Sequence, residues 1–120
     1  MSKNQLTVLR QKIRLFSGRR FSLERTAMGF IPMLAASLLE RRFRKNAPVA
    51  HYLSIPNPGG TSRHRYVRKA DVDIIRRQTE AWREFSQAMA EWVRVNREVE
   101  RLLRRIGEGR CVKIALGGRR

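Results

Sequence analysis

Apolar residues recur at helical spacing near the start of the chain. The first stripe consists of Leu6, Leu9, Ile13 and Phe16. Because these residues lie three or four positions apart, they predict an amphipathic helix over 4–16 that stops at Ser17-Gly18. A second helical turn is expected over 22–29. A third helix is expected to begin at Pro32 and to end in the basic residues 41–45, where positive charge complements the helix dipole.

The pattern changes from helical to extended after Pro48, which cannot continue a helix. Residues 49–55 are rich in β-branched and aromatic side chains, and Pro56–Gly60 has the composition of a turn. Residues 62–67 can pair back on the first strand. The sequence therefore predicts a small β-hairpin near 49–67.

The clearest apolar period in the chain runs from Asp71 to Ile106. One heptad position holds Ile75, Trp82, Met89, Asn96 and Leu103, and the other holds Gln78, Phe85, Trp92, Val99 and Ile106. This seam predicts one long helix that ends at Gly107-Glu108-Gly109 and whose aromatic residues belong to the core. The seam is covered either by the N-terminal helices of the same chain or by the same helix of a second copy.

These elements together predict a mostly α fold class, with short N-terminal helices, a small β-hairpin and one long amphipathic C-terminal helix. The length of 120 residues suits one domain, so we expect a single basic helical domain over 1–109 and a basic C-terminal tail over 110–120. The longest uncharged apolar stretch, Ala27–Leu39, is too short to span a membrane. The single cysteine, Cys111, excludes an internal disulfide and suits a reducing compartment, so we expect a cytoplasmic location.

The charge of the chain is strongly positive and unevenly distributed. Lysine and arginine number 27 against 10 acidic residues, a formal net charge of +17. Residues 1–70 contribute +13, residues 71–100 contribute −2 and residues 101–120 contribute +6. Arginine accounts for 22 of the 27 cations, and its planar guanidinium suits bidentate contacts with phosphates and stacking on bases. A polyanionic partner, RNA or DNA, would relieve the self-repulsion of such a chain.

Ten basic side chains are the candidate nucleic-acid contacts: Arg19, Arg20, Arg41, Arg42, Arg44, Lys45, Arg63, Arg65, Arg68 and Lys69. The group at 41–45 is expected at a helix end, where complementation of the helix dipole is the alternative explanation of the charge. The group at 63–69 lies on and after the return strand of the hairpin, where His64 and Tyr66 can stack on unpaired bases. Cross-strand packing is the alternative there. The remaining candidates are the tail residues Arg110, Arg119 and Arg120.

The sequence contains no arrangement that predicts an enzyme, a metal centre or a cofactor site. Pro58-Gly59-Gly60-Thr61 lacks the downstream lysine and hydroxyl residue that complete a phosphate-binding P-loop. No pair of carboxylates falls in one loop, and no nucleophile has an evident base. His51 and His64 have no cysteine or nearby acid with which to build a metal site. We therefore expect a non-enzymatic protein.

Four short motifs precede the long helix: Ser37-Leu38-Leu39-Glu40-Arg41, Tyr52-Leu53-Ser54, Gly60-Thr61 and Tyr66-Val67. Through these motifs, residues 36–106 resemble a family of small uncharacterised helical proteins of prokaryotic genomes, some of them encoded near transposases. Many members of that family carry a cysteine-rich insert with potential zinc ligands between the first two motifs, whereas residues 42–50 here contain no cysteine. The resemblance implies a nucleic-acid accessory role for a mobile element.

The sequence supports two hypotheses for the function. The first is a nucleic-acid-binding accessory protein that clamps structured RNA or DNA through arginine-rich surfaces, as a subunit of a mobile-element or ribonucleoprotein complex. The alternative is a protein-interaction adaptor or oligomerising helical scaffold, which docks a larger partner or forms a homodimer through the long-helix seam. The two hypotheses differ in the salt dependence of binding. Affinity for a nucleic acid should fall steeply as salt rises, because it depends on phosphate contacts. No membrane partner is expected.

Overall fold

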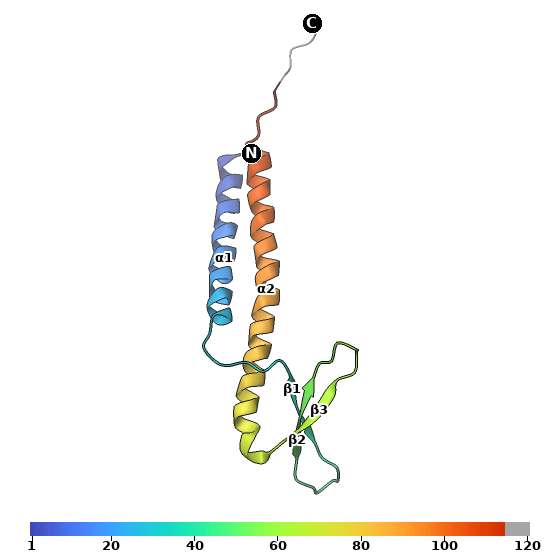
Figure 1. Cartoon of the computed structure of the whole chain (residues 1–120). Coiled ribbons are helices and arrows are strands. Elements are labelled where there is room, and N and C mark those ends of the chain that lie inside the picture. Colours follow the sequence, from blue (N-terminus) through green and yellow to red (C-terminus); the bar gives the residue numbers. More distant parts are fainter. Residues whose placement is uncertain (115–120) are drawn as a thin grey trace. The chain divides into compact units, whose positions relative to one another are not determined.

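The computed structural model describes residues 1–114 (Figure 1). Its elements are the helix α1 (Lys3–Ala27), the strands β1 (Ser37–Arg41), β2 (Ala50–Ile55) and β3 (Arg63–Val67), a 3-10 turn at Lys69–Asp71, and the helix α2 (Val72–Arg110). The expected fold class is confirmed, because the protein is mostly α, with a β-hairpin and one long C-terminal helix. Residues 115–120 of the expected tail, with Arg119 and Arg120, lie outside the described residues.

The chain forms two compact units, and α2 contributes to both. The helical unit consists of Met1–Arg25 together with the residues from Ala90 onward, and the sheet unit consists of Thr26–Met89. The single domain expected over 1–109 stays a prediction. Within residues 1–114, no helix is long and apolar enough to cross a membrane.

In the helical unit, α1 is one continuous helix, whereas the sequence predicted short helices in this region. The expected stop at Ser17-Gly18 is wrong, because the apolar stripe continues beyond it at the same spacing. The buried and half-buried members of this stripe are Leu6, Leu9, Ile13, Phe16, Arg20 and Leu23. Gly18 lies on the exposed side of the helix, with open space where a Cβ would be. Packing of the stripe therefore outweighs the roughly 1 kcal/mol that a glycine inside a helix costs.

The buried side of α2 from Ala88 onward differs by one residue from the expected seam. The position that holds Trp92, Val99 and Ile106 is buried or half-buried, as expected. The other expected position is wrong here, because Met89 and Leu103 are 38% and 53% exposed. Ala88, Val95 and Leu102 are buried in their place. The physical reason is that packing against α1 covers the flank of Val95 and Leu102, while Asn96 on the expected flank is half-buried and accepts a hydrogen bond from Arg20.

The first residue of the chain lies beside the last turn of α2 in the helical unit. The expected helix end at Gly107-Glu108-Gly109 is too early, because α2 continues to Arg110. A Cβ on Gly109 would lie only 2.3 Å from Cε of Met1. A glycine at this position therefore lets the first residue lie directly against the last turn of α2.

The sheet unit contains a three-stranded antiparallel sheet with the order β1-β2-β3. The β2–β3 hairpin confirms the predicted hairpin, and Gly60 closes its turn with a φ of 96° and a hydrogen bond from its N–H to the carbonyl of Asn57. The helix expected from Pro32 is wrong, because residues 37–41 form the edge strand β1 instead. A lone hairpin is marginally stable in water, and pairing with a third strand gives it a larger apolar face.

One face of the sheet forms the core of this unit. Ala36, Leu53, Val67 and Val72 are buried together, and Leu34, Leu38, Ile55 and Ile75 pack against them. The register places Leu38, Leu53 and Arg65 in one cross-strand row and Leu39, Tyr52 and Tyr66 in the next. Since alternate residues of a strand point to opposite faces, Leu53 marks the core face and Tyr52 marks the outer face. The N–H of Leu34 donates to the carbonyl of Gln78, 3.0 Å away, which fastens the segment before β1 to α2.

Candidate nucleic-acid interface

The outer face of the sheet carries a group of aromatic and basic side chains. We call Arg41, Phe43, Tyr52, His64 and Tyr66 the outer-face cluster. The rings of Tyr52 and Tyr66 meet edge to face with centroids 5.6 Å apart, and Phe43 meets Tyr52 in the same way at 6.3 Å. The guanidinium carbon of Arg41 lies 5.5 Å from the centroid of Tyr52, and its Nη2 lies 3.1 Å from Nδ1 of His64. These contacts join three strands and the residue two positions beyond β1.

The outer-face cluster is open to solvent. Tyr66 is 59% exposed and Phe43 is 68% exposed, although aromatic side chains of this size are usually well buried. Tyr52 is half-buried between them. Tyr66 therefore does not belong to the core.

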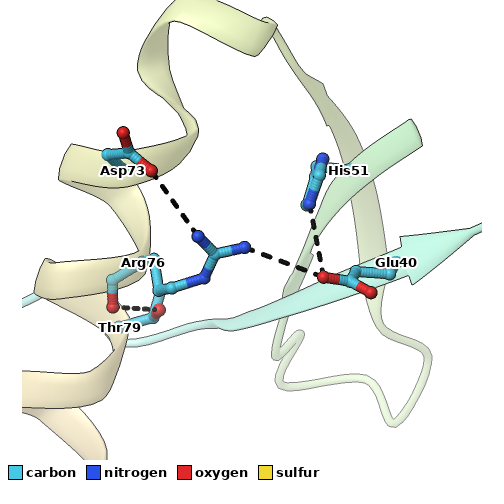
Figure 2. A network of polar contacts seen from close by, with 5 residues as sticks. All are labelled: Glu40, His51, Asp73, Arg76 and Thr79. Atoms are coloured by element: carbon cyan, nitrogen blue, oxygen red, sulfur yellow. Dashed lines mark hydrogen bonds and ion pairs between the residues drawn. The ribbon is translucent and has the colours of Figure 1, made fainter. Parts of the chain in front are cut away.

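The acidic residue of β1 points away from the outer-face cluster. Figure 2 shows Glu40 on the core face, where its Oε1 lies 3.5 Å from Nε2 of His51 and 3.7 Å from Nη2 of Arg76. Arg76 also lies 3.6 Å from Oδ1 of Asp73. These polar contacts hold Glu40 on the side of the sheet opposite to Arg41 and Tyr52. The strand positions of the outer face within the described residues therefore include no carboxylate.

The candidate cations at 41–45 lie at the end of a strand. Arg42, Arg44 and Lys45 occupy the loop between β1 and β2 and are exposed. The side chain of Arg42 donates to the carbonyl of Ala47, 3.4 Å away. The expected helix end is wrong, so complementation of a helix dipole does not explain this group. Among the described residues, no carboxylate lies within ion-pair distance of any of these cations.

The candidate cations at 63–69 are divided between surfaces. Arg63 and Arg65 share the core-face side of β3 with Val67, but both are exposed. Arg68 pairs with Asp71 at 3.2 Å, whereas Lys69 has no acidic partner in the described part of the chain. Arg63 and Arg65 therefore lie on the side of the sheet opposite to Tyr66.

The candidate cations of the helical unit are engaged within that unit. Arg19 forms two hydrogen bonds with the carboxylate of Glu91, one of them 2.8 Å long, and Nη1 of Arg20 donates to Oδ1 of Asn96 at 2.8 Å. The hydrogen bonds raise the pKa of Arg19 and hold the pKa of Glu91 below its ordinary value. Nearby, Nε1 of Trp92 donates to Oε2 of Glu24 at 2.8 Å. Arg19 and Arg20 thus link α1 to α2, which leaves them less available to phosphates.

A groove of about 430 Å³ lies between β1 and α2 in the sheet unit. Its lining alternates in charge, with Glu40 and Glu80 beside Arg76 and Arg83. Trp82 also lines it, so this aromatic residue is only partly covered. Within residues 1–114 no cluster of three or more potential metal ligands occurs. The mixed charge of the groove distinguishes it from the cationic outer face.

Sequence reasoning identified the basic residues but missed how the aromatic residues combine with Arg41. The signal was present for the tyrosines, because a hairpin centred near Gly59 places residue 52 opposite residue 66. The contribution of Arg41 and Phe43 depends on β1, which the apolar pattern did not predict as a strand. Comparisons of the chain with protein-family models, with curated proteins and with solved structures found no match.

Proposed function

We propose that the protein is a non-enzymatic nucleic-acid-binding accessory protein that contacts structured RNA or DNA through the basic surface of the sheet unit. The single observation that carries this proposal is the group of exposed cations with no acidic partner among the described residues. On the strands, loops and 3-10 turn of the sheet unit, these cations include Arg42, Arg44, Lys45, Arg63, Arg65 and Lys69. Cations that a protein does not neutralise itself are available to phosphates, and each phosphate contact releases a counterion.

The loop beside the outer-face cluster supports the same proposal. Arg42, Arg44 and Lys45 lie within four consecutive positions of this loop, are exposed, and have no acidic partner among residues 1–114. Like charges close together repel and destabilise the folded chain. An anionic partner that binds this surface would relieve that repulsion.

The setting that we propose is a ribonucleoprotein or mobile-element complex in the cytoplasm. The support for it is the resemblance of residues 36–106 to the prokaryotic family described above. The motifs that carry this resemblance fall largely on the three strands, since residues 37–41 are β1, residues 52–54 lie in β2 and residues 66–67 end β3. The shared pattern therefore concerns the sheet that also carries the outer-face cluster.

The alternative function, an adaptor or homodimer that uses the long-helix seam, requires that seam to be accessible. Val99 and Leu102 are 5% and 1% exposed within the single chain. The exposed apolar residues of this unit, among them Leu15, Phe21 and Leu103, lie outside the buried seam. Docking through the seam would first have to displace its present cover. We therefore place the alternative second.

The test is the salt dependence of binding, measured by fluorescence anisotropy with a labelled RNA hairpin and a labelled DNA duplex. Affinity is expected to fall with a log–log slope of roughly −0.7 to −0.9 for each neutralised phosphate. A variant with Arg42, Arg44 and Lys45 changed to Gln should bind more weakly and lose about two to three of those phosphate contacts from the slope.

The matched control changes Arg97, Arg101 and Arg104 to Gln. It lowers the net charge by the same amount, but in the helical unit, where two of the three arginines already have acidic partners. The control should keep most of the affinity. If both variants weakened binding equally, the contact surface would not be the sheet unit. Binding that is absent, or that does not change with salt, would refute the proposed function itself.

A further inference from the structure

We propose that the outer-face cluster binds unpaired nucleobases by stacking, so that the protein prefers single-stranded segments of RNA or DNA to a continuous duplex. This inference rests on the proposed function and names the part of the nucleic acid that the sheet recognises. The first observation is the pair of exposed rings, Tyr66 and Phe43, on either side of Tyr52. An aromatic ring on a sheet surface offers its face to a base of any sequence.

The contacts within the cluster leave the outer rings available. Tyr66 and Phe43 each touch Tyr52 edge to face, and each remains more than half exposed. Arg41 supplies a guanidinium in the same place, held by the ring of Tyr52 and the imidazole of His64. A guanidinium plane can stack on a base or contact the phosphate that follows it. The cluster thus combines ring faces with a positioned cation.

Charge identifies a nucleic acid, rather than an apolar protein segment, as the occupant. The outer face has no carboxylate at its described strand positions, because Glu40 is held on the core face by His51 and Arg76. The loop that follows Arg41 holds Phe43 and also Arg44 and Lys45, two exposed cations with no acidic partner among residues 1–114. Ring faces bordered by cations match the two components of a single strand, its bases and its phosphates.

The same geometry selects against an intact duplex. Inside a duplex, both faces of each base are covered by neighbouring base pairs, so a side chain cannot stack on them without unstacking the helix. A single strand, a loop or a bulge presents uncovered bases. Duplex nucleic acid should therefore bind through phosphate contacts alone, whereas an unpaired strand should add stacking on the cluster.

The experiment compares three labelled strands of equal length: oligo(U), oligo(dT), and an abasic DNA strand that keeps the phosphates but lacks the bases. A duplex of the same length is the fourth ligand. The full-length protein should bind oligo(U) and oligo(dT) at least about 5-fold more tightly than the abasic strand, since each stacked base contributes about 5- to 150-fold in affinity. Comparison of oligo(U) with oligo(dT) determines which sugar is preferred.

The variants test the aromatic ring of Tyr66 while leaving the charge of the protein unchanged. Tyr66→Leu removes the aromatic face but keeps an apolar residue on an exposed strand position, and should lose about 5- to 150-fold in affinity for oligo(U) or oligo(dT). Its affinity for the abasic strand should not change. Tyr66→Phe keeps the ring and should bind as the unchanged protein does. Phe21→Leu is the matched control, because Phe21 is 60% exposed but lies on α1, and it should have no effect.

The outcomes distinguish failure of the stacking inference from failure of the proposed function on which it rests. If the protein bound all four ligands equally and Tyr66→Leu had no effect, the stacking inference would be overturned while the proposed function remained. If no ligand bound, both would fail. Thermal denaturation followed by circular dichroism shows whether Tyr66→Leu is folded. If that variant proved unfolded, Phe43→Leu, in the loop beyond β1, would serve with the same expected loss for base-containing strands and the same overturning result.

Discussion

The seam of α2 in the helical unit can be tested with two neighbouring leucines. Leu102 is 1% exposed, whereas Leu103, which the heptad pattern favoured, is 53% exposed. Leu102→Ala removes three buried carbon atoms and leaves a cavity, so it should lower the free energy of unfolding by roughly 2–5 kcal/mol. Leu103→Ala changes an exposed position, so its effect should lie within about 0.5 kcal/mol. The two substitutions have the same chemistry and the same helix propensity, so their difference reports burial alone.

Urea unfolding followed by far-UV circular dichroism measures this difference in the free energy of unfolding. Thermal denaturation followed by the same signal measures the corresponding difference in Tm. For a chain of this size, each kcal/mol corresponds to about 4 °C in Tm, so Leu102→Ala should lower Tm by roughly 8–20 °C. Leu103→Ala should leave Tm nearly unchanged. If Leu103→Ala caused the larger loss, α2 would be rotated relative to the structure described here. Equal losses would indicate that both leucines are buried, as in an assembly of two copies.

Two further predictions concern α1. Gly18→Ala should raise the free energy of unfolding by about 0.5–1 kcal/mol in the same urea assay, because Gly18 is inside a helix with open space around it, and a loss of stability would mean that the helix ends there. Glu91→Gln should lower Tm at neutral pH, because the hydrogen bonds with Arg19 hold the pKa of Glu91 below its ordinary value and so stabilise the folded state wherever the carboxylate is ionised. That contribution is lost as the pH falls through the lowered pKa, so the two Tm curves should converge only at a pH below the ordinary glutamate pKa of about 4.3. A difference independent of pH would contradict this reasoning.

The sequence was sufficient to predict the long helix and the hairpin. The long helix carries an apolar period over many turns, and a turn rich in glycine and proline separates two strand-forming runs. These signals are local, so the rest of the fold does not change them. Two rows of residues flank the stripe of Trp92, Val99 and Ile106: one contains Leu103, and the other contains Leu102. The heptad pattern could not show which row is buried, because both rows are mostly apolar. Packing against α1 decides in favour of Val95 and Leu102.

The strand β1 could not be predicted from its own residues. Leu38 and Leu39 are adjacent, and a pair of adjacent apolar residues suits a helix face as well as the two faces of a strand. Only the pairing of β1 with β2 resolves the ambiguity, since it places Leu38 on the core face and Leu39 on the outer face. The mistaken helix also concealed the candidate site. Without β1, Arg41 has no reason to lie over Tyr52.

The position of Glu40 shows how the fold separates the two kinds of charge on one strand. Glu40 and Arg41 are adjacent in sequence, so their opposite charges cancel in a local count. In β1 they point to opposite faces, and Glu40 meets His51 and Arg76 while Arg41 meets Tyr52 and His64. The edge strand therefore turns a locally neutral pair into a face with positive charge. That separation is what makes the outer face suitable for a polyanion.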